Sequence, residues 1–341
     1  MAARPINKIN LIMLRVALYG TNGHQIQNAL VSQPGARIAA ICEFPRGQLP
    51  PPLRDDTAIR EHPTLDALLA DPNIDLVSLC SPRRADQAAQ AIRALRAGKH
   101  VLAEKPCALT EADLDTIIRT ARETGRAFHE MAGTAFAQPY LAMREIARSG
   151  RLGEIVQIIA EKSYPYFDAR PQDEAVDGGI IMQNAIHALR FVEHVACVPI
   201  ASIRAAETTL GNPRPDGGLR MAASFLLTLK NGGLASIAAN YLNPRGTKIW
   251  GDESLKIIGT LGIVESRGGG QTTRLVIGDD DLGPVDATPP ECGFLQTLLA
   301  SLQGRASMPF SIEDELSPTR WVIRAKQSAT QNLNPPTPPF Q

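Results

Sequence analysis

The chain has 341 residues, a length typical of two domains of about 150 residues each. Hydrophobic residues make up 44% and charged residues 21% of the chain, which indicates a globular protein with a sizeable core and excludes a low-complexity or collagen-like chain. The 35 basic and 35 acidic residues cancel, so the composition lacks the positive charge typical of proteins that bind nucleic acid or anionic membranes.

Residues 9–14 form a short apolar run near the N-terminus. The run is far shorter than the ~20 residues of a membrane span. Arg15 interrupts it, and no small-residue cleavage site follows as in a signal peptide. We therefore interpret the run as a leader into the first strand, with Met13 as an alternative start.

The cysteines are scattered, and they form neither a CxxC pair nor a zinc-like spacing with the histidines. The five positions are Cys42, Cys80, Cys107, Cys197 and Cys292. Cys42 and Cys80 end apolar runs, as buried thiols do. An odd, scattered set favours a reducing cytoplasm, and we expect no metal site.

The first 130 residues alternate between short apolar runs and segments of helical periodicity. Strands are expected at 15–19, 37–42, 74–80 and 100–103. Helices are expected at 23–32, in a segment that ends at Gly98, and from Thr110 to Gly125. Asp113 follows Thr110 at the spacing of a capping box. Continuous apolar strands that alternate with helices predict a doubly wound parallel sheet, the Rossmann arrangement.

After about residue 150 the pattern changes to extended runs at 154–160, 221–230, 234–241 and 254–258. Asn231-Gly232-Gly233 lies between two of these runs and predicts a hairpin. We expect an α+β domain here, with a large, mainly antiparallel open sheet, one or two helices, and an irregular tail at 334–341. The sequence thus predicts an α/β protein whose domains cover 1–130 and 131–341.

The segment Gly20-Thr21-Asn22-Gly23-His24-Gln25 connects the first strand to the first helix, where dinucleotide-binding folds have G-x-G-x-x-G. Asn22 and Gln25 occupy the second and third glycine positions. Gly23, and the tolerance of asparagine for left-handed backbone, keep the tight turn feasible. The place after the first strand favours a phosphate-binding loop, and an ordinary strand–turn–helix connection is the alternative.

Glu43 ends the second strand, about 20 residues after Gly20, where an acidic residue accepts a hydrogen bond from the ribose of NAD. A carboxylate at this place would repel the 2′-phosphate of NADP, so NAD is the expected cofactor. The nearby Arg46 keeps NADP possible. The alternative interpretation of Glu43 is a solvated carboxylate at a strand end.

A helical segment in the second half carries one narrow polar line, opposite a stripe of apolar residues. The line consists of Gln183, His187, Arg190 and His194. On a helix that is otherwise apolar, it indicates a buried polar cavity; the alternative is a line that faces water. One helical turn separates Gln183 from His187, so we expect their side chains to touch.

Residues 97–106 read AGKHVLAEKP, which closely resembles the "aGKHVl.EKP" signature of the Gfo/Idh/MocA family, the relatives of glucose–fructose oxidoreductase and inositol dehydrogenase. Further matching segments follow in the same order along the chain. They are Asp75–Pro82, Ser149–Glu154, Gly178-Gly179 followed by Ala185-Ile186-His187, and Gly251–Glu253 with Gly259–Gly262.

The resemblance implies an NAD(P)-dependent oxidoreductase that acts on hydroxyl or keto carbons of sugars, polyols or similar compounds. It also implies a Rossmann domain followed by an α+β domain, whose open sheet serves assembly into a homodimer or homotetramer. The implied catalytic residues are Lys105 and His187, with Gln183 beside the histidine. The expected cofactor contacts are Gly20, Thr21, Asn22, Gly23, His24, Glu43, Ser81, Pro82, Glu104, Lys105 and Pro106. The expected substrate contacts are Lys105, Tyr164, Gln183, Asn184 and His187.

The chain departs from the family pattern at three positions. Gln183 stands where the family has Asp or Asn, Arg190 where it often has Asp, and Asp86 where it has His. Two other functions therefore remain open: a redox-assisted lyase or glycosidase that retains its NAD, and a nucleotide-binding regulator without turnover. Retained nucleotide without net NADH production would mark the first, and binding without turnover would mark the second.

Several residues in the second half have both a site interpretation and a packing interpretation. Tyr164 and Tyr166 are candidates to line a sugar site or to pack in the core. Asn240, Tyr241 and Arg245 end an extended run and are candidates to reach the substrate. The expected partner is a small molecule rather than nucleic acid or a membrane.

Overall fold

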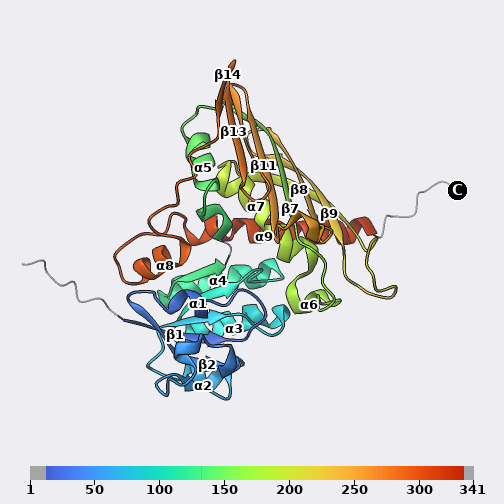
Figure 1. Ribbon diagram of the computed structural model, residues 1–341. Helices are drawn as coiled ribbons and strands as arrows, with labels where there is room; N and C mark the ends of the chain where they lie inside the picture. The colour runs from blue at the N-terminus through green and yellow to red at the C-terminus, as the bar shows by residue number, and fades with distance from the viewer. Residues whose placement is uncertain (1–12, 132, 334–341) are drawn as a thin grey trace, which may run out of the picture.

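The computed structural model describes residues 13–131 and 133–333, so most of the expected leader and the whole tail at 334–341 lie outside the described residues. Two sheets are stacked along the molecule (Figure 1). The N-terminal half forms the lower sheet in that view, and the later strands form the upper one.

In the described chain, six parallel strands form the first sheet, in the order β3-β2-β1-β4-β5-β6. Their bounds are β1 (Leu14–Tyr19), β2 (Ala36–Cys42), β3 (Arg60–Glu61), β4 (Leu76–Leu79), β5 (His100–Glu104) and β6 (Phe128–Met131). The order runs outward in both directions from the β1–β4 pair, as in a doubly wound sheet. The predicted parallel sheet and its four predicted strands are confirmed.

The helices of this half are α1 (Gln27–Leu30), α2 (Leu65–Leu69), α3 (Arg84–Arg96) and α4 (Glu111–Thr124), with short 3₁₀ turns η1 (Arg46–Gln48) and η2 (Pro51–Leu53). The capping box at α4 is confirmed, because Thr110 Oγ1 accepts a 3.1 Å hydrogen bond from Asp113 N. Gly125 ends α4 with a left-handed φ of 63°. The helix predicted at 23–32 is wrong in extent, since only 27–30 is helical.

The second sheet has eight strands in the described chain, in the order β14-β13-β12-β11-β7-β10-β9-β8. Their bounds are β7 (Ile155–Ser163), β8 (Ile200–Thr208), β9 (Ala222–Leu229), β10 (Leu234–Asn240), β11 (Asp252–Gly259), β12 (Gly262–Arg267), β13 (Thr272–Ile277) and β14 (Asp280–Gly283). Every neighbouring pair is antiparallel except β7 and β10. The predicted sheet type and the hairpin at 231–233 are confirmed.

The second half carries more helix than the one or two helices predicted. The structure has α5 (Tyr140–Arg148), α6 (Glu174–Asp177), α7 (Ile186–Arg190), α8 (Phe294–Leu302) and α9 (Ile312–Leu333), with 3₁₀ turns η3 (Gly133–Phe136) and η6 (Arg245–Thr247). Two π-helical turns, η4 (Ile180–Asn184) and η5 (Phe191–Val195), flank α7. Together η4, α7 and η5 form one continuous helical run, 180–195.

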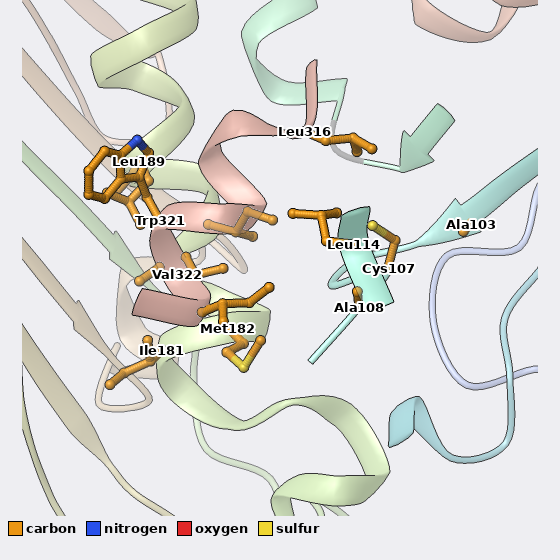
Figure 2. Packing of buried hydrophobic residues seen from close by; sticks show 14 of the residues in the cluster. Ala103, Cys107, Ala108, Leu114, Ile181, Met182, Leu189, Leu316, Trp321 and Val322 are labelled. Carbon is orange, nitrogen blue, oxygen red and sulfur yellow. The ribbon is translucent and has the colours of Figure 1, made fainter. Parts of the chain in front are cut away.

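The two halves share a hydrophobic core. Ala103, Cys107 and Leu114 from the first half lie near Leu316 and Val322 of α9 and Met182 of the helical run (Figure 2). The opposite face of the first sheet packs against α8, through Leu298 and Leu299. Since β6 ends at Met131 and α8 returns to the first sheet, the division into domains at 130/131 stays a prediction.

Candidate functional site

The candidate site lies at the carboxyl ends of β1, β4 and β5. In a doubly wound sheet this is the crevice where the strand order reverses and ligands bind. Gly20 follows β1 with a φ of 69°, and a Cβ there would overlap Cys80 O. Asn22, at the second glycine position, donates through Nδ2 to Pro82 O at 3.1 Å and Val176 O at 2.6 Å. The asparagine thus ties the loop to the second half of the chain.

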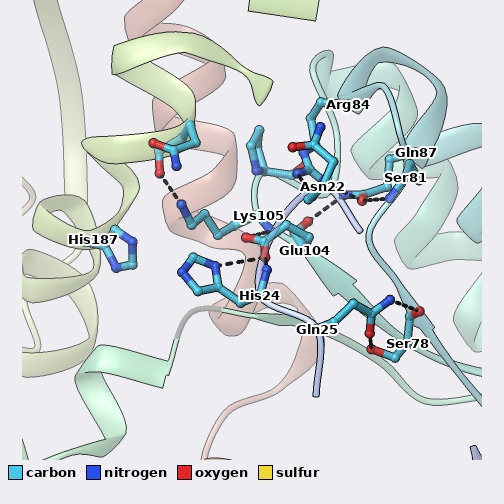
Figure 3. A network of polar contacts seen from close by, with 12 residues as sticks. Asn22, His24, Gln25, Ser78, Ser81, Arg84, Gln87, Glu104, Lys105 and His187 are labelled. Atoms are coloured by element: carbon cyan, nitrogen blue, oxygen red, sulfur yellow. Dashed lines mark hydrogen bonds and ion pairs between the residues drawn. The ribbon is translucent and has the colours of Figure 1, made fainter. Parts of the chain in front are cut away.

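Gln25, at the third glycine position, folds its amide back onto the strand ends (Figure 3). Its Nε2 donates to Tyr19 O and Gly20 O at 3.0 Å and to Ser78 O at 3.1 Å. Its Oε1 accepts from Ser78 Oγ at 2.7 Å. These bonds hold the ends of β1 and β4 together and keep 23–26 out of the helix, which explains why α1 is short.

Glu104 is a buried carboxylate at the end of β5, and its hydrogen bonds with His24 anchor the loop that follows β1. Its Oε2 accepts from the His24 backbone N–H and, at 3.0 Å, from His24 Nδ1, while its Oε1 accepts from Lys105 N at 2.9 Å. Burial would raise the pKa of Glu104. The hydrogen bond from His24 and the charge of Lys105 outweigh burial and lower that pKa to about 2. A Cβ on Gly23 would overlap this carboxylate.

Lys105 follows Glu104 and is 1% exposed. Its Nζ donates to Gln183 O at 2.8 Å, across to the helical run (Figure 3). Burial, together with the charges of Arg84 and Lys162, lowers the pKa of Lys105 to about 8, against the opposing effect of Glu104. The amine is therefore mostly protonated at pH 7 and loses its proton as pH rises through about 8.

On both sides of His187, the backbone hydrogen bonds of the helical run change from the α-helical to the π-helical pattern. Ala185 N bonds to Ile180 O at 3.1 Å and Ala196 N to Phe191 O at 2.8 Å, the five-residue spacing of π turns. Such turns occur frequently at functional sites. All four residues of the predicted polar line face the protein interior, because His187, Arg190 and His194 are buried and Gln183 is partly buried.

The members of the polar line have different partners. Gln183 Oε1 accepts from Tyr241 OH at 3.2 Å. Arg190 pairs with Glu130 at 2.6 Å, and His194 Nε2 donates to Asp314 O at 2.8 Å. Gln183 lines the charged cavity described below and His187 the apolar one, and the contact between their side chains stays a prediction. Only the first two members of the line therefore face the candidate site.

His187 is 7% exposed, and its Nε2 lies 3.4 Å from Tyr164 OH. Burial and the nearby charges of Lys105 and Lys162 lower the pKa of His187 well below its usual value. The imidazole is therefore neutral at pH 7 and able to accept a proton. Burial raises the pKa of Tyr164, so that hydroxyl stays protonated.

Two cavities flank Lys105 and share His24, Lys105 and Tyr164. The apolar cavity, about 350 Å³, is also lined by Ile26, Leu102, Met131, Gly133, Lys162, His187, Phe294 and Leu295. The charged cavity, about 310 Å³, is also lined by Asn22, Gly23, Arg84, Glu104, Phe167, Ala169, Arg170, Pro171, Asp177, Gln183 and Trp250. Lys105 thus contributes to the lining of both cavities.

Sequence reasoning missed Lys162, Arg84 and Arg170. Lys162 is buried and pairs with Glu253 at 2.5 Å. The burial of Lys162 could have been predicted from the alternation along β7, because Lys162 lies on the same buried face of the strand as Ile158 and Ala160. Arg84 gave no comparable signal, since its burial depends on bonds to Gln87 Oε1 and Asn22 O.

The remaining predicted residues lie as follows. Asn184 is buried, and its Nδ2 donates to Asn240 O at 3.1 Å. Ser81 Oγ donates to Gln90 Oε1 at 2.5 Å and Pro106 O accepts from Gln87 Nε2 at 3.1 Å, whereas Thr21 and Pro82 are exposed. Tyr166 packs against the core, Arg245 is exposed, and Asp86 is exposed in the first turn of α3.

Glu43 and Arg46 differ in whether their side chains are available to bind a ligand. Glu43 is exposed just after β2 with a φ of 50°. Arg46 donates to the carbonyl oxygens of Arg54, Asp56 and Ile59. The carboxylate is therefore free to accept a hydrogen bond, while the guanidinium is engaged within the loop 46–61.

The crevice fits a dinucleotide. Gly20 lets backbone approach closely at the strand reversal, exposed Glu43 stands at the end of β2, and an apolar cavity able to take a flat ring adjoins Lys105. Among residues 13–131 and 133–333, no cluster of His, Cys, Asp or Glu has the makings of a metal site. All five thiols are free, with Cys42, Cys80 and Cys107 buried. No helix in these ranges is both long and apolar enough to cross a membrane.

Comparison with known families gives two matches that follow one another along the chain. Residues 14–132 match a model described as "Oxidoreductase family, NAD-binding Rossmann fold". Residues 140–265 match the model of the "GFO/IDH/MocA C-terminal domain". The first match assigns an NAD(P)-binding Rossmann domain to the half that carries the crevice.

Individual relatives are similar over shorter stretches. A dTDP-3,4-didehydro-2,6-dideoxy-alpha-D-glucose 3-reductase from Streptomyces violaceoruber is 34% identical over 37% of this chain and 37% of its own length. A 1,5-anhydro-D-fructose reductase from Ensifer adhaerens is 32% identical over 38% of this chain and 40% of its own. The chain therefore matches well under half the length of these relatives. In fold, it resembles GenD2 from gentamicin A biosynthesis in complex with NAD, with a TM-score of 0.77, 19% identity, and coverage of 97% of this chain and 98% of that one.

Proposed function

The chain belongs to the Gfo/Idh/MocA family of oxidoreductases, and from that premise we propose that it transfers a hydride between nicotinamide and a carbon that bears a hydroxyl or keto group. The proposed substrate is a sugar, a polyol or a similar small molecule. Two relatives named as reductases of sugar derivatives support this class.

The proposed cofactor residues surround the crevice described above. The loop 20–24, with Ser81 and Pro82 beside it, would hold the phosphates, and Glu43 would accept from the adenosine ribose. Glu104, Lys105 and Pro106 would border the nicotinamide. When bound, the cofactor accepts or delivers the hydride. Because Arg46 is engaged by three carbonyl oxygens, we favour NAD over NADP.

Lys105 and His187 would divide the work on the substrate oxygen. His187 is neutral at pH 7 and accepts the hydroxyl proton during oxidation. Lys105, with a pKa of about 8, is largely protonated at pH 7 and stabilises negative charge on that oxygen. In the reduction direction the same groups return the proton. Gln183 positions Lys105 through its carbonyl oxygen, and Tyr164 and Asn184 complete the proposed contacts.

This proposal rests on one observation: Lys105 and His187 both line the apolar cavity at the end of β5. The test is native mass spectrometry of the purified protein for retained nucleotide, followed by NADH measurements with sugars and polyols. We expect nucleotide binding and turnover of at least one compound. Retained nucleotide without net NADH formation would point to a redox-assisted lyase or glycosidase. Binding without turnover across the panel would point to a regulator.

We also propose self-association through the outer face of the second sheet. Leu226, Ser236 and Ile159 lie side by side across β9, β10 and β7, and Leu226 is 52% and Ile159 42% exposed. Exposed apolar side chains in one row favour a protein interface. We expect a homodimer or homotetramer in light scattering, and Leu226→Glu should dissociate it. A 36.7 kDa monomer at micromolar concentration would contradict the proposal.

A further inference from the structure

The charged cavity carries an excess of positive charge next to the proposed reaction centre. Three cationic side chains line it: Arg84, Arg170 and Lys105. The carboxylates among the described lining residues are Glu104 and Asp177. Glu104 is already held by His24 and by the backbone of Lys105. A ligand with one negative charge would therefore balance the excess positive charge of the cavity lining.

Arg170 is the cation least satisfied by the protein. It is 4% exposed, and its Nε has no hydrogen-bond partner among the described residues. Its ion pair with Asp177 is long, at 3.9 Å between Nη1 and Oδ2. A buried guanidinium carries five N–H donors, and leaving them without acceptors costs free energy. Among the described residues, the Nε–H of Arg170 therefore lacks an acceptor, and its Nη1 has a long ion pair with Asp177.

The guanidinium of Arg170 is also held in place. Its central carbon lies 3.7 Å from the ring centroid of Tyr241 and 4.6 Å from that of Phe167. Stacking on aromatic rings leaves the edges of the guanidinium plane available for in-plane hydrogen bonds. Two parallel N–H groups on one edge match the two oxygens of a carboxylate. The wall of the charged cavity thus contains a guanidinium whose plane is oriented by its aromatic neighbours before a ligand binds.

We propose that the substrate carries a carboxylate, which Arg170 binds, so that the enzyme acts on a sugar acid or another polyhydroxy acid rather than on a neutral sugar. This inference rests on the proposed oxidoreductase function, since it places the reacting carbon of the acid beside Lys105. Gln183, which accepts from Tyr241 OH, lies in the same wall and fixes the ring that Arg170 stacks on.

The first test compares acids with neutral compounds that match them in carbon skeleton. D-gluconate is paired with D-glucitol, D-glucuronate with D-glucose, and L-tartrate with L-threitol, each in the presence of NAD. We expect at least one acid to exceed its neutral partner by about 10- to 100-fold in kcat/KM, the worth of a charge-assisted hydrogen bond. Equal or better turnover of the neutral partner in every pair would overturn the proposal.

The second test changes Arg170. Arg170→Gln should remove the preference for the acid, mainly through a higher KM for the acid. Arg170→Lys keeps the charge but loses the fork, and should retain part of the preference. Arg214→Gln is the matched control, because Arg214 is an exposed arginine that donates to Asp168 O at 2.7 Å outside the cavity. This control should keep the full preference for the acid.

Binding measurements separate the two proposals. Titration with NAD alone should give the same affinity for the wild type and Arg170→Gln; a loss of about tenfold would assign Arg170 to the cofactor and overturn the carboxylate site. Thermal shift with the three acids in the presence of NAD reports binding without turnover. If an acid stabilises the wild type but not Arg170→Gln and nothing is turned over, the carboxylate site stands and the oxidoreductase proposal fails. If no acid binds, the carboxylate site is wrong.

Discussion

The two cavities that flank Lys105 are similar in volume and opposite in chemistry. The apolar cavity draws its wall from β5, β6 and α8, with Leu102, Met131 and Phe294 as its body. The charged cavity draws its wall from the segment 164–177, with Arg170 and Asp177 facing Lys105. A flat ring gains from the first surface through burial, and a polar ion gains from the second through hydrogen bonds. Under the proposed function, this difference favours the nicotinamide in the apolar cavity and the substrate in the charged one.

Lys105 is shared by both cavities, so replacing it tests the comparison most directly. Lys105→Met and His187→Ala should each lower turnover by ~10²–10⁴-fold, the usual worth of a positioned acid or base. NADH formation with the best substrate of the panel measures this, and NAD titration shows whether the cofactor still binds.

A matched control for Lys105→Met is Lys99→Met, at the other end of the same strand. Lys99 is also buried, and its Nζ donates to Asp71 O at 2.6 Å and Ile74 O at 3.0 Å. We expect Lys99→Met to lower stability without lowering turnover per folded molecule. Equal losses in the two variants, or normal turnover in His187→Ala, would show that burial rather than chemistry explains these residues.

Arg190 lies on the same helical run as His187 but lines neither cavity, so its loss should affect stability rather than binding. Glu130, its partner, is fully buried and also accepts from Thr319 Oγ1 and Cys107 N at 2.7 Å. Arg190→Met should lower the free energy of unfolding by ~3–5 kcal/mol, because it leaves a buried carboxylate without its counter-charge. Urea unfolding measures the loss, and Arg190→Met with Glu130→Leu should recover part of it. A loss below 1 kcal/mol would contradict this account.

Glu43 lies outside both cavities and tests the far end of the cofactor. A charge-assisted hydrogen bond contributes ~1.5–3 kcal/mol, about ten- to a hundredfold in affinity. Glu43→Ala should therefore weaken NAD binding by that factor and leave NADP binding unchanged or improved. Titration with both cofactors checks the result. Equal binding of NAD and NADP by the wild type would mean that another group governs the choice.

Gln183→Asp introduces a charge into the wall of the charged cavity and should have the smallest effect. Because the pKa of Lys105 is about 8, the wild-type rate should fall as pH rises through 8 and the ammonium is lost. A carboxylate at 183 stabilises the charged forms of Lys105 and His187 and raises both pKa values. Both limbs of the pH–rate profile should then move to higher pH, by about 1 unit or less. An unmoved profile would separate residue 183 from the proton path.

Sequence patterns predicted the elements that depend on local rules. The strands of the first sheet, the capping box at Thr110 and the hairpin at 231–233 all follow from short-range periodicity or turn chemistry. The non-helical conformation of residues 23–26 does not follow from such local rules. It depends on hydrogen bonds between the side chain of Gln25 and Ser78 on another strand. Helical propensity is overridden there by long-range hydrogen bonds.

The candidate site divides in the same way. The positions of Lys105 and His187 followed from a motif and from a polar line on a helix. The hydrogen bond from Tyr241 to Gln183 was not predicted, because it joins the helical run to a residue that follows β10. Arg170 was not predictable, because its surroundings combine Phe167, Asp177 and Tyr241 from two separate segments.

The return of α8 to the first sheet has a consequence for synthesis of the chain. All strands of that sheet have been synthesised once Met131 is added, but Leu298 and Leu299, which cover one of its faces, follow much later. Until then the nascent N-terminal half exposes Val16, Leu18 and Leu102 of that cluster. Exposed apolar surface of this kind invites aggregation during translation. The apolar cavity, which Phe294 and Leu295 of α8 line, is therefore completed only near the end of translation, and a chain that ends before α8 would leave its apolar wall exposed.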